Sequence, residues 1–354
     1  MGSPDLNIPH NLPLIATEDL EAVNATLTSG WIAQGKAVSS LESFFVEKYA
    51  QGFSCALSSG TSALFLALKG LGIKTGDRVA IPTYACSAIL NAVYMLQAKP
   101  VLVDVLPDTF CLDPQGLNEV QDISAVVAVH TFGAKADVQK MIDSHVVVED
   151  CCQSVWGADN ESLLGMVGSA AVFSFYATKI ITGGQGGLVW SRDESLVNTV
   201  KDYRQFDGRT FYEPRFNFQM SDIQASLIVS QFKRFETITR RRQFIARQYL
   251  DALPIGLSFQ KGADKTDAVL QRFVVIAPNV SIRDRFQKHM LDGGVNCIVP
   301  IMRFELLHNY LKLDPQQYPV AENIADRTLS LPIYPALTDA QVKLISNCIK
   351  NFKI

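Results

Sequence analysis

Lys179 and Asp150 are the two residues whose types and positions most directly suggest chemistry. Lys179 follows an apolar, strand-like run at 170–176 and precedes the glycine-rich turn 183–187. Asp150 ends an earlier apolar run. A lysine at a strand end can form a Schiff base with a carbonyl cofactor, and a carboxylate on a neighbouring strand can hold that cofactor's pyridinium nitrogen. The pair predicts an enzyme that uses pyridoxal phosphate, with Lys179 as its catalytic lysine.

The phosphate of such a cofactor needs backbone N–H donors at the start of a helix. A small, polar stretch, Ser58-Ser59-Gly60-Thr61-Ser62, immediately precedes a strongly helical segment. We expect Gly60 to permit a close approach and Thr61 and Ser62 to offer amides and hydroxyls. Ser174, shortly before Lys179, could add another hydroxyl. The same stretch is also explained as a simple helix cap.

The ring of the cofactor makes further demands. Gln153 could donate a hydrogen bond to its phenolic oxygen. Tyr84 stands where a strand gives way to a helix, at the sheet edge where α/β proteins bind ligands, and we expect it to stack on the ring. Each residue also has a structural explanation: Asp150 as a turn cap, Gln153 as an exposed loop amide and Tyr84 as core packing.

The elements that must position these residues alternate between strand and helix. Short apolar runs separated by helical segments predict an α/β fold with a parallel sheet covered on both faces. Ser221-Asp222 predicts the start of a long helix over 223–253. We expect a large cofactor-binding domain with an N-terminal arm at 1–236 and a smaller α+β domain at 237–354, which contains a strand at 273–276 and a helix at 339–351.

Composition excludes several classes of protein. Lys+Arg 32 against Asp+Glu 35 gives a net charge of −3 with no long run of one sign, so we expect no nucleic-acid or membrane surface. No stretch approaches the about 18 apolar residues of a membrane span. The cysteines are odd in number and scattered, with no C-x-x-C pair, which fits a reduced cytoplasm and predicts no metal site.

Motifs along most of the chain together resemble the DegT/DnrJ/EryC1/StrS family of pyridoxal phosphate-dependent sugar aminotransferases. The resemblance implies the aspartate-aminotransferase fold (fold type I), with a mostly parallel seven-stranded sheet flanked by helices and a smaller α+β C-terminal domain. The segments that carry it are 30–35 with Glu42, 59–64, 103–105, Val129-His130 with Gly133, Asp150-x-x-Gln153, 174–179, Arg204 with Gly208, 217–225 and 329–332.

The resemblance also implies a reaction and an assembly. Glutamate would donate an amino group to a nucleotide-linked keto-sugar in a ping-pong cycle, with Lys179 as acid and base in both halves. Asn217 is expected to cross a homodimer interface to the partner's cofactor phosphate, so that two chains share each active site. Arg204, Arg209 and Arg215 could approach the substrate's diphosphate, although a solvated surface explains them equally well.

Departures from the family pattern leave alternatives open. Gln185 replaces a glutamate that usually follows the lysine, and the segment from Val299 to His308 is irregular. Relatives that dehydrate sugars have histidine at position 179, so the lysine favours transamination. The alternatives are an aminotransferase for a keto-cyclitol or related substrate, a dehydratase-like relative, and a cofactor-binding protein without turnover. A Rossmann-type nucleotide enzyme is disfavoured because no G-x-G-x-x-G follows the first strand.

Overall fold

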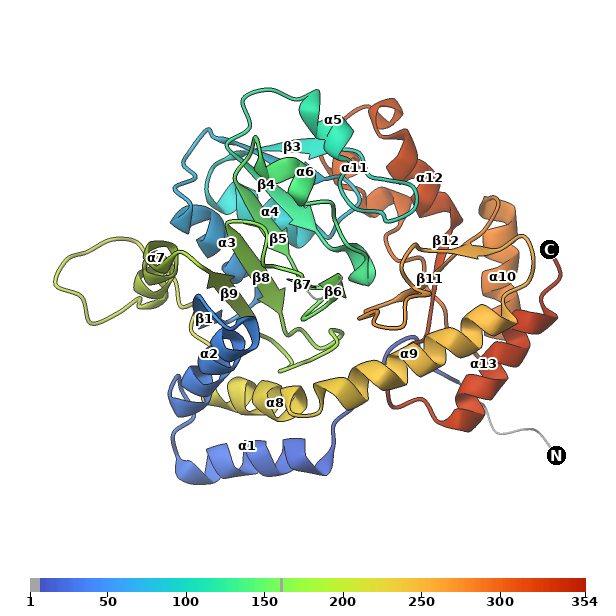
Figure 1. Cartoon of the computed structure of the whole chain (residues 1–354), viewed down its shortest axis with the longest axis horizontal. Coiled ribbons are helices and arrows are strands. Elements are labelled where there is room, and N and C mark those ends of the chain that lie inside the picture. Colours follow the sequence, from blue (N-terminus) through green and yellow to red (C-terminus); the bar gives the residue numbers. More distant parts are fainter. Residues whose placement is uncertain (1–6, 160–161) are drawn as a thin grey trace.

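A seven-stranded sheet forms the centre of the molecule (Figure 1). The computed structural model describes residues 7–159 and 162–354. The strand order is β1-β9-β8-β5-β4-β2-β3, and only β9 runs antiparallel to its neighbours. The predicted mostly parallel seven-stranded sheet is confirmed. The strands are β1 Phe53–Leu57, β2 Arg78–Pro82, β3 Lys99–Val103, β4 Ala125–Val129, β5 Val147–Asp150, β8 Ala170–Ser174 and β9 Gly187–Ser191.

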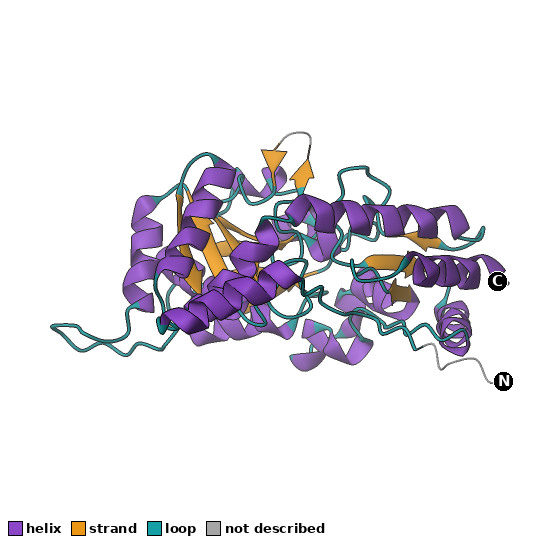
Figure 2. Cartoon of the chain, turned by 90° about the horizontal axis from the view of Figure 1, so that it is seen from below, coloured by secondary structure: helices purple, strands orange, loops and turns teal. Residues whose placement is uncertain are grey.

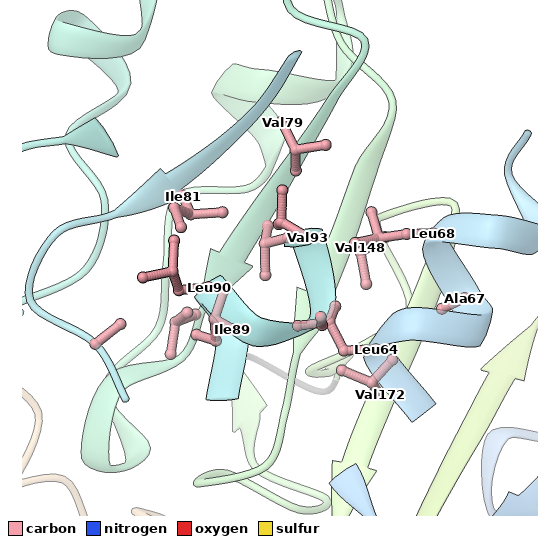
Figure 3. Packing of buried hydrophobic residues seen from close by; sticks show 14 of the residues in the cluster. Leu64, Ala67, Leu68, Val79, Ile81, Ile89, Leu90, Val93, Val148 and Val172 are labelled. Carbon is pink, nitrogen blue, oxygen red and sulfur yellow. The ribbon is translucent and has the colours of Figure 1, made fainter. Parts of the chain in front are cut away.

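Helices cover both faces of this sheet, as its apolar strands require. One face packs against α3 (Gly60–Gly70), α4 (Ser87–Met95) and α7 (Glu194–Arg204). Figure 3 shows side chains of α3 and α4 meeting those of the strands in this layer. The other face packs against α2 (Lys36–Tyr49) and α8 (Asp222–Phe232). Two short helices also pack on the large sheet: α5 (Pro114–Asn118) and α6 (Gln139–Ile142). A small separate hairpin is formed by β6 (Ala158–Asp159) and β7 (Ser162–Leu163).

A second, three-stranded sheet lies towards the C-terminal end of the chain. Its order is β10-β11-β12, and a separate apolar cluster fills its core. The N-terminal segment joins it, because the N–H of Ile8 donates to Gly294 O at 2.8 Å. The elements are β10 Ser258–Phe259, β11 Phe273–Ile276, β12 Thr328–Leu331, α9 Phe235–Ala252, α10 Val280–Asp292 and α13 Asp339–Asn351.

The predicted long helix over 223–253 is two helices. Ser221 caps the first as expected, since its Oγ accepts the N–H of Gln224 at 3.3 Å. The chain then breaks at Arg234 (φ −110°, ψ 14°) before α9 begins. The guanidinium of Arg234 is bonded to the buried carboxylate of Asp19 at 2.6 Å, at the start of α1 (Thr17–Ser29). This tertiary contact, which sequence periodicity cannot reveal, fixes the break.

Part of the C-terminal third returns to the large sheet. The segment 301–327 contains the helices η2 (Arg303–Glu305), α11 (Leu307–Tyr310), η3 (Pro315–Gln317) and α12 (Pro319–Arg327). Its apolar side chains share one core with β2, α3 and α4. Asp104, just after β3, accepts the N–H groups of Val320 and Ala321 at 2.9 and 3.0 Å and so holds the start of α12.

One loop projects far from the body. It follows α7, spans residues 205–221 and is called here the projecting loop; Figures 1 and 2 show it extending away from the sheet. Large apolar side chains along it are exposed, and Tyr212 is 91% exposed. None of the helices in the described part of the chain has the length and apolar content of a membrane span.

Candidate active site

The site lies at the edge of the large sheet where its parallel strands end. Asp150 is the last residue of β5 and Ser174 the last of β8. Lys179 follows in the turn after β8, where its N–H donates to Tyr176 O at 2.9 Å. In parallel α/β sheets this carboxyl edge is where ligands bind. The topology therefore brings the predicted lysine and carboxylate to one place.

The loop before α3 offers backbone donors. Ser59 caps the helix, because its Oγ accepts the N–H of Ser62 at 3.1 Å. The N–H groups of Gly60 and Thr61 have no acceptor among the described residues and can bind an anion. Ser62 differs from our expectation: it is 3% exposed and its hydroxyl donates to Ser59 O at 2.8 Å. That hydroxyl supports the loop and is not available to a ligand.

Gly60 and Ser174 face each other across this cradle. A Cβ at Gly60 would lie 2.8 Å from Ser174 Cβ and 3.3 Å from Cys152 Sγ. Glycine at position 60 therefore permits the close packing of this loop against Ser174, and the predicted approach of a phosphate stays a prediction. The glycine-rich turn closes the same cradle from another side, because a Cβ at Gly187 would lie 2.1 Å from Ser59 O. Gln185, at the tip of the turn, is exposed.

Asp150 and Gln153 each keep one polar atom free. Asp150 is 6% exposed, and its Oδ1 accepts the N–H of Cys152 at 2.9 Å while Oδ2 has no partner among the described residues. Gln153 Oε1 accepts the N–H of Phe132 at 2.8 Å, which orients the side chain and leaves its amide nitrogen unused. The backbone of Phe132 has a left-handed φ of 57°, which is uncommon for a residue other than glycine. A free carboxylate oxygen and a free amide donor suit a pyridinium nitrogen and a phenolic oxygen.

Cys152 lies near both Asp150 and Lys179, and sequence reasoning gave it no role in the site. Burial raises the pKa of the Cys152 thiol well above its ordinary value; the charge of Asp150 raises it further, and the charge of Lys179 acts in the opposite direction. Its thiol therefore lies within electrostatic reach of both residues. Its spacing, two residues after Asp150, was the available signal. Lys179 is half-buried, and its Nζ has no hydrogen-bond partner among the described residues.

A narrow crevice beside Lys179 is lined by both ends of the chain. Residues 11–14 of the N-terminal segment form one wall, and Arg242 and Pro335 contribute from the C-terminal part. The carbonyl of Leu14 accepts a hydrogen bond from Gln231 at 3.2 Å, which fixes this wall.

The prediction that Tyr84 stacks on the cofactor ring is wrong in this structure. Tyr84 is 0% exposed, and its ring packs edge-on against Phe110 and Phe132 at centroid distances of 5.8 and 6.3 Å. The helix α4 begins only at Ser87, so Tyr84 belongs to the buried turn before it. Cys86 is the first exposed residue after β2 and lies within electrostatic reach of Cys152.

The arginines proposed for a diphosphate are engaged elsewhere. Arg204 is buried, and its Nη1 donates to Glu42 Oε1 at 2.5 Å and to Ala56 O at 2.9 Å. Arg209 and Arg215 both pair with the carboxylate of Asp202. These guanidiniums hold α7 and the base of the projecting loop. Their approach to a substrate diphosphate stays a prediction.

Asn217 lies on the projecting loop and is exposed. Its Oδ1 accepts the N–H of Gln219 at 3.1 Å, which forms a local turn. The next residue, Phe218, accepts the N–H of Ser58 at 2.8 Å, beside the phosphate cradle. The crossing of Asn217 to a partner chain stays a prediction.

A buried cluster of His130, Glu149 and Cys151 has ligand atoms within 4.8 Å of one another. His130 Nδ1 accepts the N–H of Ala136 at 3.1 Å, so Nε2 carries the proton that is donated to Glu149 at 2.9 Å. The carboxylate also accepts backbone N–H groups at 165, 167 and 168. Burial alone would raise the pKa of Glu149, but these bonds hold it below its ordinary value. The lone pairs are already used, so the cluster is structural.

Comparisons with known proteins give independent evidence of the family and the fold. The model of the DegT/DnrJ/EryC1/StrS aminotransferase family matches residues 13–350. The chain is 28% identical to spore coat polysaccharide biosynthesis protein SpsC of Bacillus subtilis, over 97% of this chain and 96% of that protein. It is 27% identical to GDP-perosamine synthase of Vibrio cholerae, over 98% and 99% of the two chains.

Solved structures share the fold. The putative sugar aminotransferase Spr1654 from Streptococcus pneumoniae, in its PMP form, superposes with a TM-score of 0.90 over 97% of each chain at 22% identity. DesV of S. venezuelae does so with a TM-score of 0.86 at 27% identity, over 94% of this chain and 93% of that one. The fold, the gathered site and the match of the family model along almost the whole sequence lead to one conclusion. The chain is an enzyme of the DegT/DnrJ/EryC1/StrS aminotransferase family.

Proposed function

We propose that the protein is a pyridoxal phosphate-dependent aminotransferase that transfers an amino group from glutamate to a nucleotide-linked keto-sugar. The observation that carries the proposal is the meeting of Lys179, the free Oδ2 of Asp150 and the unpaired N–H groups of the Gly60 loop at one sheet edge. A surface lysine would need none of these neighbours.

The residues present fit the cofactor. A Cβ at Gly60 would fill the space between that residue and Ser174, so only glycine leaves this cradle open. The free N–H groups of Gly60 and Thr61 suit a phosphate. Asp150 would hold the ring nitrogen, and Gln153 would donate to the phenolic oxygen. When bound, pyridoxal phosphate supplies a reactive carbonyl carbon and an electron-accepting ring.

The side chains of the chain itself perform the remaining tasks. Lys179 would hold the cofactor and then move a proton at the substrate carbon in both half-reactions. The half-buried position of its amino group, with no competing acceptor, leaves the Nζ atom free for that movement. The buried negative charge of Asp150 would keep the ring nitrogen protonated. Gln153 is already oriented by the Phe132 N–H, so its amide needs no rearrangement.

The substrate class rests on the relatives. GDP-perosamine synthases of Vibrio cholerae and Escherichia coli O157:H7 match 98% of the chain at 27% and 26% identity. Their name supports a nucleotide-linked sugar as the amino acceptor. Glutamate follows from the family resemblance. A cytoplasmic location would give access to such substrates.

We also propose a homodimer with shared active sites. The aromatic side chains of the projecting loop, among them Phe211 and Tyr212, are exposed to solvent. Exposed apolar side chains that gather on one surface often mark a protein–protein interface. A groove of about 1190 Å³ between α1 and α2 lies beside Trp31, which is itself exposed. A second copy would cover both regions and would bring Asn217 to the partner's phosphate.

The test is the absorption spectrum of the purified protein reconstituted with pyridoxal phosphate. A cofactor bound covalently through Lys179 absorbs in the near-visible range, and we expect glutamate to bleach this band and a keto-sugar nucleotide to restore it. Lys179→Ala should lose the band and all turnover. A protein that never becomes coloured would overturn the cofactor assignment, and a coloured protein that no amino donor bleaches would indicate a binding protein without turnover.

A further inference from the structure

The guanidinium of Arg272 lies over the ring of Phe132, the residue whose N–H orients Gln153 at the candidate site. Arg272 precedes β11 of the small sheet. Its neighbour Gln271 donates its backbone N–H to Phe132 O at 3.2 Å and its side-chain amide to Thr178 O at 3.3 Å. Phe132 holds Gln153, and Thr178 precedes Lys179. The two contacts place Arg272 against the loops that carry the cofactor residues.

The guanidinium of Arg272 has no negative partner. No carboxylate of the described residues lies within ion-pair distance of it, whereas Arg204, Arg215 and Arg234 each pair with one. Its Cζ lies 5.4 Å from the centroid of the Phe132 ring, and its Nε is buried without a hydrogen-bond partner. Glu305 acts on it only at longer range, and the carboxylate of that residue accepts the N–H of Met302 at 2.8 Å.

His10, the one side chain within hydrogen-bond distance of Arg272 among the described residues, cannot supply a negative charge. Its Nε2 lies 3.5 Å from Arg272 Nη1 and 2.9 Å from Ser330 Oγ. Burial, and after it the charge of Arg272, lowers the pKa of His10 to about 3. The imidazole is therefore neutral near pH 7. Burial lowers the pKa of Arg272 as well, but an arginine keeps its proton in a protein. A largely buried cation without a counter-ion is unfavourable unless a ligand supplies the charge.

Arg242 shows that burial alone does not explain Arg272. Arg242 is 3% exposed and also lacks a carboxylate, but its Nη1 donates to the carbonyls of Leu270 and Ile333 at 3.2 and 2.7 Å. Those bonds give Arg242 a structural task. No backbone carbonyl of the described residues accepts from Arg272.

We propose that Arg272 binds the α-carboxylate of the amino donor and so aims the donor's amino group at the cofactor beside Lys179. This inference rests on the proposed aminotransferase function. The planar fork of N–H groups in a guanidinium matches a single carboxylate with two parallel bonds. Neither the aromatic ring of Phe132 nor the neutral His10 carries a negative charge. The positive charge of the Arg272 guanidinium is therefore available to a ligand. A diphosphate bound at Arg272 is the competing outcome.

The experiment measures the two half-reactions separately in the cofactor-loaded protein. Arg272→Met keeps the packing over Phe132 and removes the charge. We expect the glutamate concentration for half-maximal bleaching to rise about 100-fold, because a buried charge-assisted contact is lost. The rate at which a keto-sugar nucleotide converts the pyridoxamine form back to the pyridoxal form should be unchanged. Arg240→Gln, at an exposed position paired with Glu236, is the matched control and should behave as the unaltered protein.

A second readout does not depend on turnover. Glutarate, a dicarboxylate without an amino group, should bind the cofactor-loaded protein in calorimetry, and Arg272→Met should abolish that binding. The melting temperature of Arg272→Met should be unchanged or higher because an unpaired buried charge is removed. Arg242→Met should instead lower it, because that side chain holds backbone carbonyls.

The outcomes separate the inference from the function on which it rests. Unchanged glutamate dependence and glutarate binding in Arg272→Met would overturn the role of Arg272 and leave the aminotransferase proposal standing. A selective loss in the keto-sugar half-reaction would show that Arg272 binds the diphosphate, which also overturns the proposal. If glutamate never bleaches the unaltered protein, the proposed function itself fails. If Arg272→Met does not fold, the role is structural and the inference is wrong.

Discussion

At the scale of single residues, the site depends on polar atoms that the protein leaves without partners. Asp150 uses one oxygen to hold the N–H of Cys152 and keeps the other free. Gln153 uses its carbonyl and keeps its amide nitrogen. Both atoms lie after the carboxyl ends of the parallel strands, where α/β sheets bind ligands, so they are available to a ligand.

Asp150→Asn should slow the half-reaction with glutamate about 100-fold while the protein remains folded. The amide can still accept from Cys152 but cannot stabilise a protonated ring nitrogen. Stopped-flow measurement of bleaching checks this. Asp108→Asn, at an exposed position bonded to Lys261, is the control. An unchanged bleaching rate in Asp150→Asn would remove Asp150 from the proposed mechanism.

His10 should make the free energy of unfolding depend on acidity. Its pKa is about 3 in the folded protein and near 6.5 in the unfolded chain. Between these values the unfolded chain binds a proton that the folded chain lacks, so stability is full above about pH 6.5 and falls towards pH 3.

We expect the unaltered protein to lose about 2 kcal/mol more than His10→Gln between pH 7 and pH 5. Urea unfolding at both pH values measures this difference. Equal losses in the two proteins would show that His10 does not contribute to the acid sensitivity.

Sequence reasoning located residues that belong to local motifs and missed those defined by tertiary contact. Lys179, Asp150 and Gly60 could be singled out as candidates because a strand end, a carboxylate and a helix start are visible in the chain. Tyr84 was misplaced because the pattern does not show whether a turn residue faces the core or the pocket. Arg272 could not be singled out from the sequence. What distinguishes this residue is that no carboxylate of the described residues pairs with it, and only the tertiary structure shows that.

At the scale of elements, the glycine-rich turn acts as a spacer between β9 and the phosphate cradle. Gly186 forms an isolated bridge with Ser59, and Gly187 faces Ser59 O at a distance that excludes any side chain. The turn thus fixes the cradle and the lysine loop relative to each other. The repeated glycines were visible in the sequence, but their contact with a segment more than a hundred residues earlier was not.

Gly187→Ala should cost about 3 kcal/mol or more of stability and should weaken binding of pyridoxal phosphate, because the new methyl group displaces Ser59. Thermal unfolding and titration with the cofactor measure the two effects. Gly116→Ala, where the closest neighbour is a Val103 methyl group at 3.3 Å, is the matched control. A fully stable Gly187→Ala protein with normal cofactor affinity would contradict the role of this contact.

At the scale of the whole molecule, the segment 301–327 joins the two sheets. His308 is 0% exposed; its Nδ1 lies 2.7 Å from Thr83 Oγ1, and its Nε2 lies 2.9 Å from Glu322 Oε1. The contact with Thr83 fixes the turn that leads to Cys86. Alternating strands and helices predicted the large layer, but no local pattern predicts that a C-terminal segment returns to it.

The shared active site can be tested by mixing two inactive chains. If Asn217 serves the partner's cofactor, a dimer of Lys179→Ala and Asn217→Ala chains has one intact site and one site that lacks both groups. Random mixing should then restore about a quarter of the sites. Activity after refolding of the mixture measures this. Arg240→Gln in place of Asn217→Ala controls for mixing, and no gain over the separate variants would contradict the crossing of Asn217.

The wall beside Lys179 has a consequence for how the protein is made. Residues 11–14 are synthesised long before Pro335, with which they line one crevice, and Ile8 is synthesised long before Gly294, to which its N–H donates. Domains fold as their residues emerge, yet this wall cannot form before Pro335 has been synthesised. The crevice beside Lys179 is therefore completed late in synthesis. A nascent chain that has not reached residue 335 lacks this wall, and removal of residues 11–14 would leave the same crevice open.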